Sequence, residues 1–148
     1  MKSAFTMIEL IFVIVILGIL SAVAIPKLSA TRDDAMISKA AHIISTSATE
    51  VQSYAASQGS VNQDLSTMSN LILGAVVQNE ATLDIVNSLV DFKMGSRDDC
   101  ITMAVVGVTD MNLTLTFGAP GDALCDSLQG MFDTSVNVMP LRGEYVVR

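Results

Sequence analysis

A single carboxylate stands inside a long apolar run near the start of the chain. The run is Phe5–Ile25, with the sequence FTMIELIFVIVILGILSAVAI, and its only charged residue is Glu9. As a helix rising about 1.5 Å per residue it would be about 30 Å long, which matches the hydrocarbon layer of a membrane. A carboxylate in lipid is destabilising by roughly 3 kcal/mol or more unless it meets a partner. The chemistry expected of Glu9 is therefore pairing with a positive group inside a membrane.

The two cysteines of the chain, Cys100 and Cys125, could form a disulfide. Disulfides persist in oxidising compartments, and closing a loop of about 25 residues would stabilise the fold by roughly 3–4 kcal/mol. No C-x-x-C motif is present, and no histidine lies near enough in sequence to suggest a metal site. We expect a disulfide in an exported domain, with two free buried thiols as the alternative.

The remaining candidate residues do not form a catalytic constellation. His42 is the only histidine, and it falls on the polar face of a predicted helix without a nearby nucleophile. Asp98 and Asp99 could contribute to a calcium site, but two adjacent carboxylates supply few of the oxygen ligands that calcium needs. The sequence also has no phosphate-binding glycine-rich loop, nucleophile elbow or zinc motif. It therefore predicts no enzyme, no metal and no cofactor.

The residues ahead of the apolar run resemble a short leader. Lys2, Ser3 and Ala4 all precede Phe5, whereas a secretory signal places its small-residue cleavage site after an apolar run of 7–15 residues. A cut between Ala4 and Phe5 would leave the apolar helix in the mature protein. The alternative is a conventional cut after the run, near Ser21 and Ala22, which would release a secreted protein.

With these residues the chain resembles the type IV pilin-like proteins, namely pilins and the pseudopilins of type II secretion. The resemblance covers about the first 30 residues and is carried by Lys2, the junction between Ala4 and Phe5, Thr6, Glu9, the apolar run through Leu20, and Pro26. One departure is Ala4, where the family usually has glycine. The resemblance implies that prepilin peptidase cuts before Phe5 and methylates the new amine, and that Glu9 recruits each incoming subunit.

The resemblance also implies partners and a location. The partners would be prepilin peptidase and homologous pilin or pseudopilin subunits. The location would be the bacterial inner membrane, crossed once, with the C-terminal domain in the periplasm. The mature chain would begin with a positive amine at Phe5, one helical turn from Glu9, so the amine of one subunit could neutralise Glu9 of its neighbour and set their register. The alternative is a membrane-tethered periplasmic binding domain that does not polymerise.

The apolar pattern predicts that the first helix continues beyond the membrane. Six residues recur at spacings of four and three and form one stripe: Ile37, Ala41, Ile44, Ala48, Val51 and Ala55. Lys39, His42, Thr46, Glu50 and Ser53 form the opposite, solvent-facing side. We expect Pro26 to kink this helix and Gly59 to end it after Gln58.

The C-terminal part predicts a small α+β domain. Val- and Thr-rich segments at Cys100–Val106 and Asn112–Phe117 indicate a hairpin. Asp122 could cap a short helix that extends to Phe132 and contains Cys125. The other expected elements are a helix at Leu65–Asn79, a strand at Val90–Met94 and a final strand at Glu144–Val147. The predicted fold class is α+β, in which a long bent N-terminal helix packs on a small antiparallel sheet, as in the pilin fold.

The predicted parts of the chain are thus a leader (residues 1–4), a transmembrane helix (5–25), its periplasmic continuation (26–58) and a globular domain (59–148). Without residues 1–26 the chain keeps its net charge of −7, because Lys2 and Glu9 cancel. This acidic balance, with no tryptophan, offers no basic surface or stacking platform for nucleic acid. We therefore expect no direct contact with nucleic acid.

Overall fold

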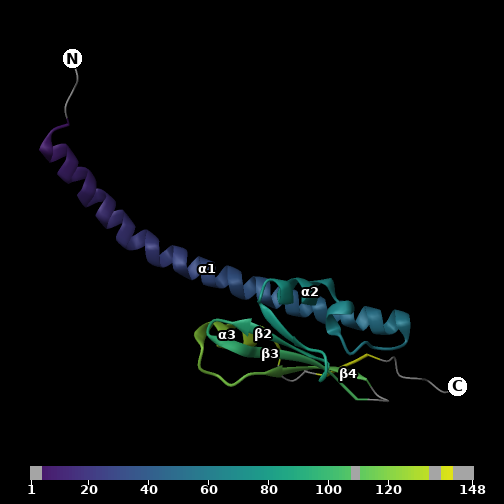
Figure 1. The fold of residues 1–148 in the computed structure, drawn as a ribbon. Helices are drawn as coiled ribbons and strands as arrows, with labels where there is room; N and C mark the ends of the chain where they lie inside the picture. The colour runs from purple at the N-terminus through teal and green to yellow at the C-terminus, as the bar shows by residue number, and fades with distance from the viewer. Residues whose placement is uncertain (1–4, 108–110, 134–137, 142–148) are drawn as a thin grey trace. The chain divides into compact units, whose positions relative to one another are not determined.

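The computed structural model describes residues 5–107, 111–133 and 138–141 of the chain. These residues divide between two compact units, Met1–Met36 and Ile37–Arg148. Figure 1 shows that the elements of the second unit are a stretch of helix, an antiparallel sheet and several short helical segments. Ala4 and the predicted strand at Glu144–Val147 lie outside the described residues.

The first helix, α1, runs from Met7 to Gln58 and supplies residues to both units. Pro26 lies inside it, and the helix continues through this residue, because a proline removes only one backbone hydrogen bond. The helix ends at Gly59, which has a φ of +66° and donates its N–H to the carbonyl of Ala55 at 2.9 Å. The predicted end of the helix is confirmed.

The predicted stripe on the second half of α1 forms the helical side of the core. Ile44, Ala48, Val51 and Ala55 are at most 5% exposed, and Ile37 and Ala41 pack against the same core. Two of these first four residues are alanines. Because their side chains are small, the backbone of α1 can lie close to the sheet. The stripe therefore joins α1 to the globular domain as the pattern predicts.

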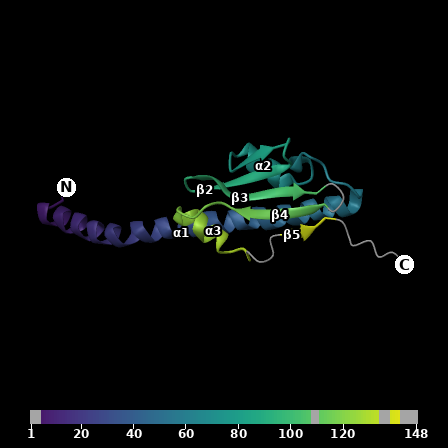
Figure 2. The same ribbon diagram turned by 90° about the horizontal axis from the view of Figure 1, so that it is seen from below.

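The sheet is a meander in which each described strand pairs with the next one along the chain, all antiparallel. Figure 2 shows β2 to β5 side by side along the second half of α1. Val90, Met103 and Leu115 stand opposite one another in adjacent strands and are all buried. The strands are β1 Ala81–Asp84, β2 Leu89–Met94, β3 Arg97–Val106, β4 Asn112–Phe117 and β5 Val138–Pro140. The predicted α+β class and the hairpin of β3 and β4 are confirmed.

The predicted helix at Leu65–Asn79 is wrong in its continuity. The structure has a 3₁₀ turn, η1 Leu65–Thr67, and then a separate helix, α2 Asn70–Val77. Ser69 causes the break, since its hydroxyl accepts a hydrogen bond from the N–H of Ile72 at 3.2 Å and so starts a new helix. The same hydroxyl donates to the carboxylate of Glu50 at 2.6 Å, so Glu50 lies against α2 instead of facing only solvent.

Strand β1 has no counterpart among the predicted elements. Its pairing with β2 depends on the turn between them, where both carboxylate oxygens of Asp84 accept hydrogen bonds. The donors are the backbone N–H groups of Val86 and Asn87 and the side-chain amide of Asn87. These bonds lower the pKa of Asp84, and the side-chain amide of Asn87 has the largest effect. Strand β1 and this turn could not be recognised because the segment Ala81–Met94 mixes apolar and acidic residues in a way that fits neither the helix period nor the strand period.

The third helix, α3 Ala123–Gln129, has Asp122 as its N-cap, as predicted, and ends earlier than predicted because Gly130 is its C-cap. A disulfide joins Cys125 of this helix to Cys100 of β3, whose Cα atoms are 5.6 Å apart. Both cysteines are fully buried. The side-chain amide of Gln129 donates to the carbonyl of Cys100 at 2.8 Å, so α3 is fixed to the sheet at both of these positions. The predicted disulfide is present in the structure.

Asp122 also connects α3 to the turn between β2 and β3. Its carboxylate accepts hydrogen bonds from the N–H of Ser96 at 3.0 Å, from the Ser96 hydroxyl at 2.7 Å and from the N–H of Cys125 at 3.1 Å. These bonds lower the pKa of Asp122 to about 2, and the Ser96 N–H has the largest effect. The neighbouring Gly95 has a φ of +63°, and a Cβ there would lie 2.3 Å from the carboxylate, so this approach requires glycine.

Removing the disulfide should destabilise the globular domain. The two cysteines are 25 residues apart, and losing a cross-link of that length lowers the free energy of unfolding by roughly 3–4 kcal/mol. Denaturant unfolding of the full chain in detergent, followed by circular dichroism, would compare the wild type with a variant that combines Cys100→Ala and Cys125→Ala. Equal midpoints for the two proteins would contradict this expectation.

The contacts of Asp122 should make the domain sensitive to acid. Because the folded pKa of about 2 lies below the ordinary value of 3.8, the stabilisation is complete above about pH 4 and is lost as the pH falls toward 2. In Asp122→Asn this part of the pH dependence should disappear, while the N-cap is kept. Thermal unfolding between pH 5 and 2 would measure it, with Asp98→Asn as a control that removes one exposed carboxylate.

Candidate assembly site

The start of α1 is closed by reciprocal hydrogen bonds between Thr6 and Glu9. The Thr6 N–H and hydroxyl both donate to Oε2 of Glu9, at 2.9 Å and 2.7 Å, and the Glu9 N–H donates to Oγ1 of Thr6 at 3.4 Å. This arrangement is a capping box, which satisfies backbone donors that a helix start leaves unpaired. The T-x-x-E spacing ahead of an apolar run could have revealed this role of Thr6 from the sequence.

The capping box occupies only one oxygen of the Glu9 carboxylate. Among the described residues no hydrogen bond reaches Oε1, and Glu9 takes part in no ion pair. The charge of Glu9 is thus partly satisfied by its own helix, while lone pairs remain for a donor from outside the unit. Thr6 also holds the carboxylate in one orientation at the beginning of the helix.

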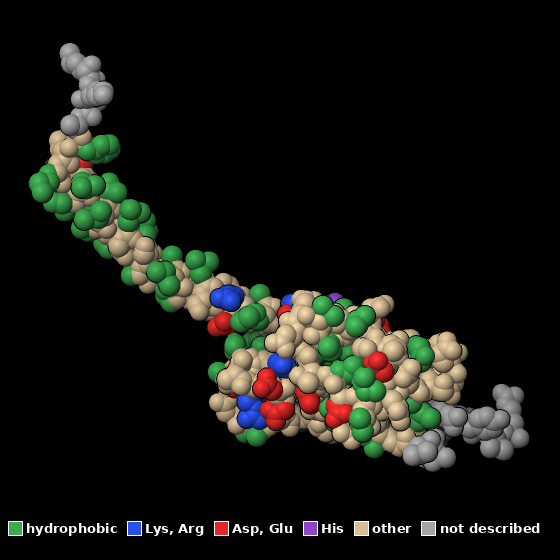
Figure 3. Space-filling model, in the orientation of Figure 1, with side chains coloured by type: hydrophobic (Ala, Val, Ile, Leu, Met, Phe, Trp, Pro, Cys, Tyr) green, Lys and Arg blue, Asp and Glu red, His purple; other side chains and the backbone are tan. Residues whose placement is uncertain are grey.

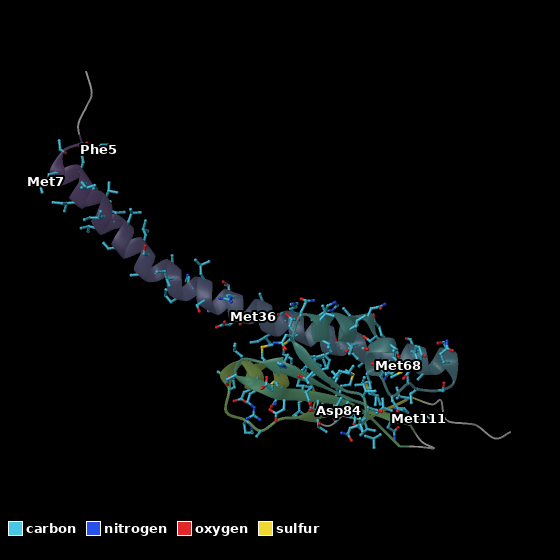
Figure 4. All side chains as sticks on the ribbon, in the orientation of Figure 1. Phe5, Met7, Met36, Met68, Asp84 and Met111 are labelled. Atoms are coloured by element: carbon cyan, nitrogen blue, oxygen red, sulfur yellow. A yellow bond between two sulfur atoms is a disulfide. The ribbon has the colours of Figure 1, made fainter. Side chains whose placement is uncertain are left out.

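Apolar side chains surround Glu9. Phe5, Ile8, Phe12 and Val13 lie beside it on an open side of the helix. Figure 3 shows hydrophobic side chains covering this half of α1, and Figure 4 shows side chains that stand out from the helix around Phe5 and Met7. The structure therefore places a carboxylate on a surface that is otherwise apolar.

The large apolar residues between Phe5 and Leu28 are all exposed. Their exposed fractions range from 41% at Ile16 to 83% at Phe5. The most apolar 18-residue window of α1 has a mean hydropathy of 2.9, and none of it is buried. By length and composition the helix is able to cross a membrane. An apolar surface of this extent has to be covered by lipid or by other protein.

The predicted site residues are not all brought together. Phe5 and Glu9 lie close to each other at the start of α1, whereas Pro26 lies in the interior of the helix. Cys100 and Cys125 belong to the disulfide of the globular unit. Ala4, on the other side of the predicted cleavage point, is outside the described residues.

The other candidate side chains have ordinary surface environments. Asp99 forms an ion pair with Arg97 at 3.1 Å, and Asp98 lies 3.8 Å from Lys93. His42 is exposed, with Nδ1 3.4 Å from the hydroxyl of Thr46. In residues 5–107, 111–133 and 138–141, no group of three or more His, Cys, Asp or Glu side chains is placed to hold a metal ion.

Comparison with known proteins gives no relative of this chain. The chain matches no protein-family model, no curated protein and no solved structure.

Proposed function

We propose that this chain is a type IV pilin-like subunit that assembles into a pilus or a type II secretion pseudopilus through its first helix. Prepilin peptidase would cut between Ala4 and Phe5 and methylate the new amine at Phe5. Before assembly the subunit would be embedded in the bacterial inner membrane, with its acidic domain in the periplasm. The observation that carries the proposal is Glu9, held by Thr6 on an otherwise apolar and fully uncovered helix surface.

The capping box supports processing before Phe5. Its donors on Thr6 are the backbone N–H and the hydroxyl, and a cut on the N-terminal side of Phe5 changes neither group. Cleavage would therefore add a positive amine next to Glu9 without disturbing the start of the helix. Because Oε1 accepts no bond from the described residues, it is available to the amine of a neighbouring subunit. Such a charge-assisted hydrogen bond is stronger in an apolar environment than in water.

The second unit supports a subunit that is exported. Its buried disulfide is typical of proteins in oxidising compartments. A helix packed through a stripe that includes alanines onto a five-stranded antiparallel sheet has the architecture that the pilin fold implies.

One observation favours the second candidate, a tethered periplasmic binding domain that does not polymerise. Thr6 already donates two hydrogen bonds to Glu9, so the carboxylate is partly satisfied in a single copy. A lone helix of this kind could remain in the membrane with Glu9 near the head groups. In that case the residues around Glu9 would tolerate substitution, and the amine would not be methylated.

Mass spectrometry of the protein purified from cells that contain prepilin peptidase would test the processing step. We expect a chain that lacks Met1–Ala4 and carries one additional methyl group on Phe5. An intact N-terminus in such cells would contradict the proposal and favour the tethered domain. A start beyond Ser21 would instead mean a secreted protein whose apolar helix has been removed.

Substitution of Glu9 would test assembly separately from membrane insertion. Glu9→Val and Glu9→Gln should both insert normally, because the apolar run is retained, but their incorporation into filaments should fall by about tenfold or more, since a close charge pair is lost. Thr6→Val keeps the backbone N–H donor and should have a smaller effect. Quantitative cross-linking in membranes would measure incorporation, with Ile16→Val, farther along the apolar run, as a control. Normal incorporation of Glu9→Gln would refute this role of the charge.

A further inference from the structure

A second set of charges lies on the same side of α1 as Glu9. Lys27 follows Glu9 by 18 residues, which is five turns of about 3.6 residues, and Asp34 follows Lys27 by seven, about two turns. Phe5, whose amine would be free after cleavage, precedes Glu9 by four residues. All four residues belong to the unit Met1–Met36. The helix period therefore places Glu9, Lys27 and Asp34 along one line of α1, and Phe5 comes just before the first turn of this helix.

Lys27 and Asp34 are both exposed, and neither belongs to an ion pair in the described part of the chain. They cannot pair with each other within one copy, since seven residues separate them by about 10.5 Å along the axis. Both therefore remain available to a partner whose charges have a matching spacing. A second copy of this chain has that spacing.

The two pairs require a displacement in the same direction. If one copy is displaced so that its Phe5 lies level with Glu9 of a parallel neighbour, the offset is four residues, or about 6 Å. If Lys27 of the same copy lies level with Asp34 of that neighbour, the offset is seven residues, or about 10.5 Å. The difference of about 4.5 Å is within the reach of a flexible lysine side chain. One displacement can therefore satisfy both pairs, whereas zero displacement would place like charges together.

We propose that Lys27 of each subunit pairs with Asp34 of the next, as a second register contact that acts together with the amine of Phe5 and Glu9. This inference rests on the proposed function, because it requires copies to associate through α1. In the proposed filament a rotation and a rise relate the copies, so the same side of every helix faces the common axis. We assign this place to the side that carries Glu9, Lys27 and Asp34, which brings these charges together. Such a contact joins different residues on the two partners and extends as an open filament.

Arg32 and Asp33 provide matched controls on other sides of the helix. They follow Lys27 by five and six residues, which places them about 140° and 240° away around the axis. They carry the same kinds of charge in nearly the same positions along the helix. Arg32 is exposed like Lys27, whereas Asp33 is half-buried, so Arg32 is the closer control. An effect of net charge or of the membrane surface would not distinguish them from Lys27 and Asp34.

Cysteine cross-linking tests the displacement in the full chain. Two differently tagged copies, one with Lys27→Cys and one with Asp34→Cys, are expressed together in cells that contain prepilin peptidase, and their membranes are oxidised. A disulfide needs Cα atoms within about 7 Å, so we expect mixed dimers to exceed both kinds of like dimer. The native cysteines are buried in their own disulfide and do not compete. Like dimers in equal or larger amounts would overturn the inference while leaving assembly intact.

Charge reversal tests the attraction. Lys27→Glu and Asp34→Lys should each lower filament incorporation by about fivefold, the size expected of an exposed ion pair, and combining them in one chain should restore it. Arg32→Glu and Asp33→Lys should have little effect. If Lys27→Glu weakens assembly and Asp34→Lys does not, Lys27 binds lipid head groups, and the proposed pairing of Lys27 with Asp34 is wrong. If no two copies cross-link, even through Gly18→Cys in the apolar run, the proposed function fails together with this inference.

Discussion

The structure depends on an apolar surface that is exposed along the first half of α1. From Phe5 to Leu28 every large apolar side chain of α1 stands in the open, although the same helix buries a stripe of small and aliphatic residues farther along. A helix can serve two such environments because its backbone hydrogen bonds are internal throughout. The environment of each half is then decided by side chains alone. Everything proposed for this protein concerns what covers the first half.

Charges on the first half of α1 limit the registers in which this surface can pack against a second copy. A purely apolar helix would associate in many registers, because lipid and neighbouring helices are about equally apolar. Glu9 restricts the choice, since an unpaired carboxylate in this setting is penalised. Thr6 prepares the carboxylate by fixing one of its oxygens in the capping box. In the proposed filament Lys27 and Asp34 favour a displacement in the same direction, at the point where the helix leaves the apolar run. Register would thus come from a few polar positions, while the apolar side chains supply the contact area.

A disulfide and several polar contacts join distant segments of the globular unit. The disulfide and Gln129 fix α3 to β3, and Asp122 fixes the same helix to the turn after β2. Two further contacts involve α1. Lys39 forms an ion pair with Glu80, just before β1, and Glu50 accepts a hydrogen bond from Ser69, just before α2. These polar contacts join segments that are distant in sequence around one small core. Such a unit can be carried on a helix whose exposed half is engaged elsewhere.

The sequence by itself determined the features that depend on local period and composition. These are the length of α1 and its end at Gly59, the buried stripe, the hairpin of β3 and β4, and the helix capped by Asp122. Each of them repeats a pattern or uses a capping residue that is recognisable within a few positions. The T-x-x-E pattern of the capping box at Thr6 is also present in the sequence.

Only the tertiary structure decided the features that join distant segments. Strand β1 forms because β2 pairs with it across the turn at Asp84, and α2 begins at Ser69, which also bonds to Glu50 of α1. The disulfide pairing was the one long-range contact that counting residues could predict, since the chain has two cysteines. The rest could not be predicted because a hydrogen bond between remote side chains leaves no periodic trace in the sequence.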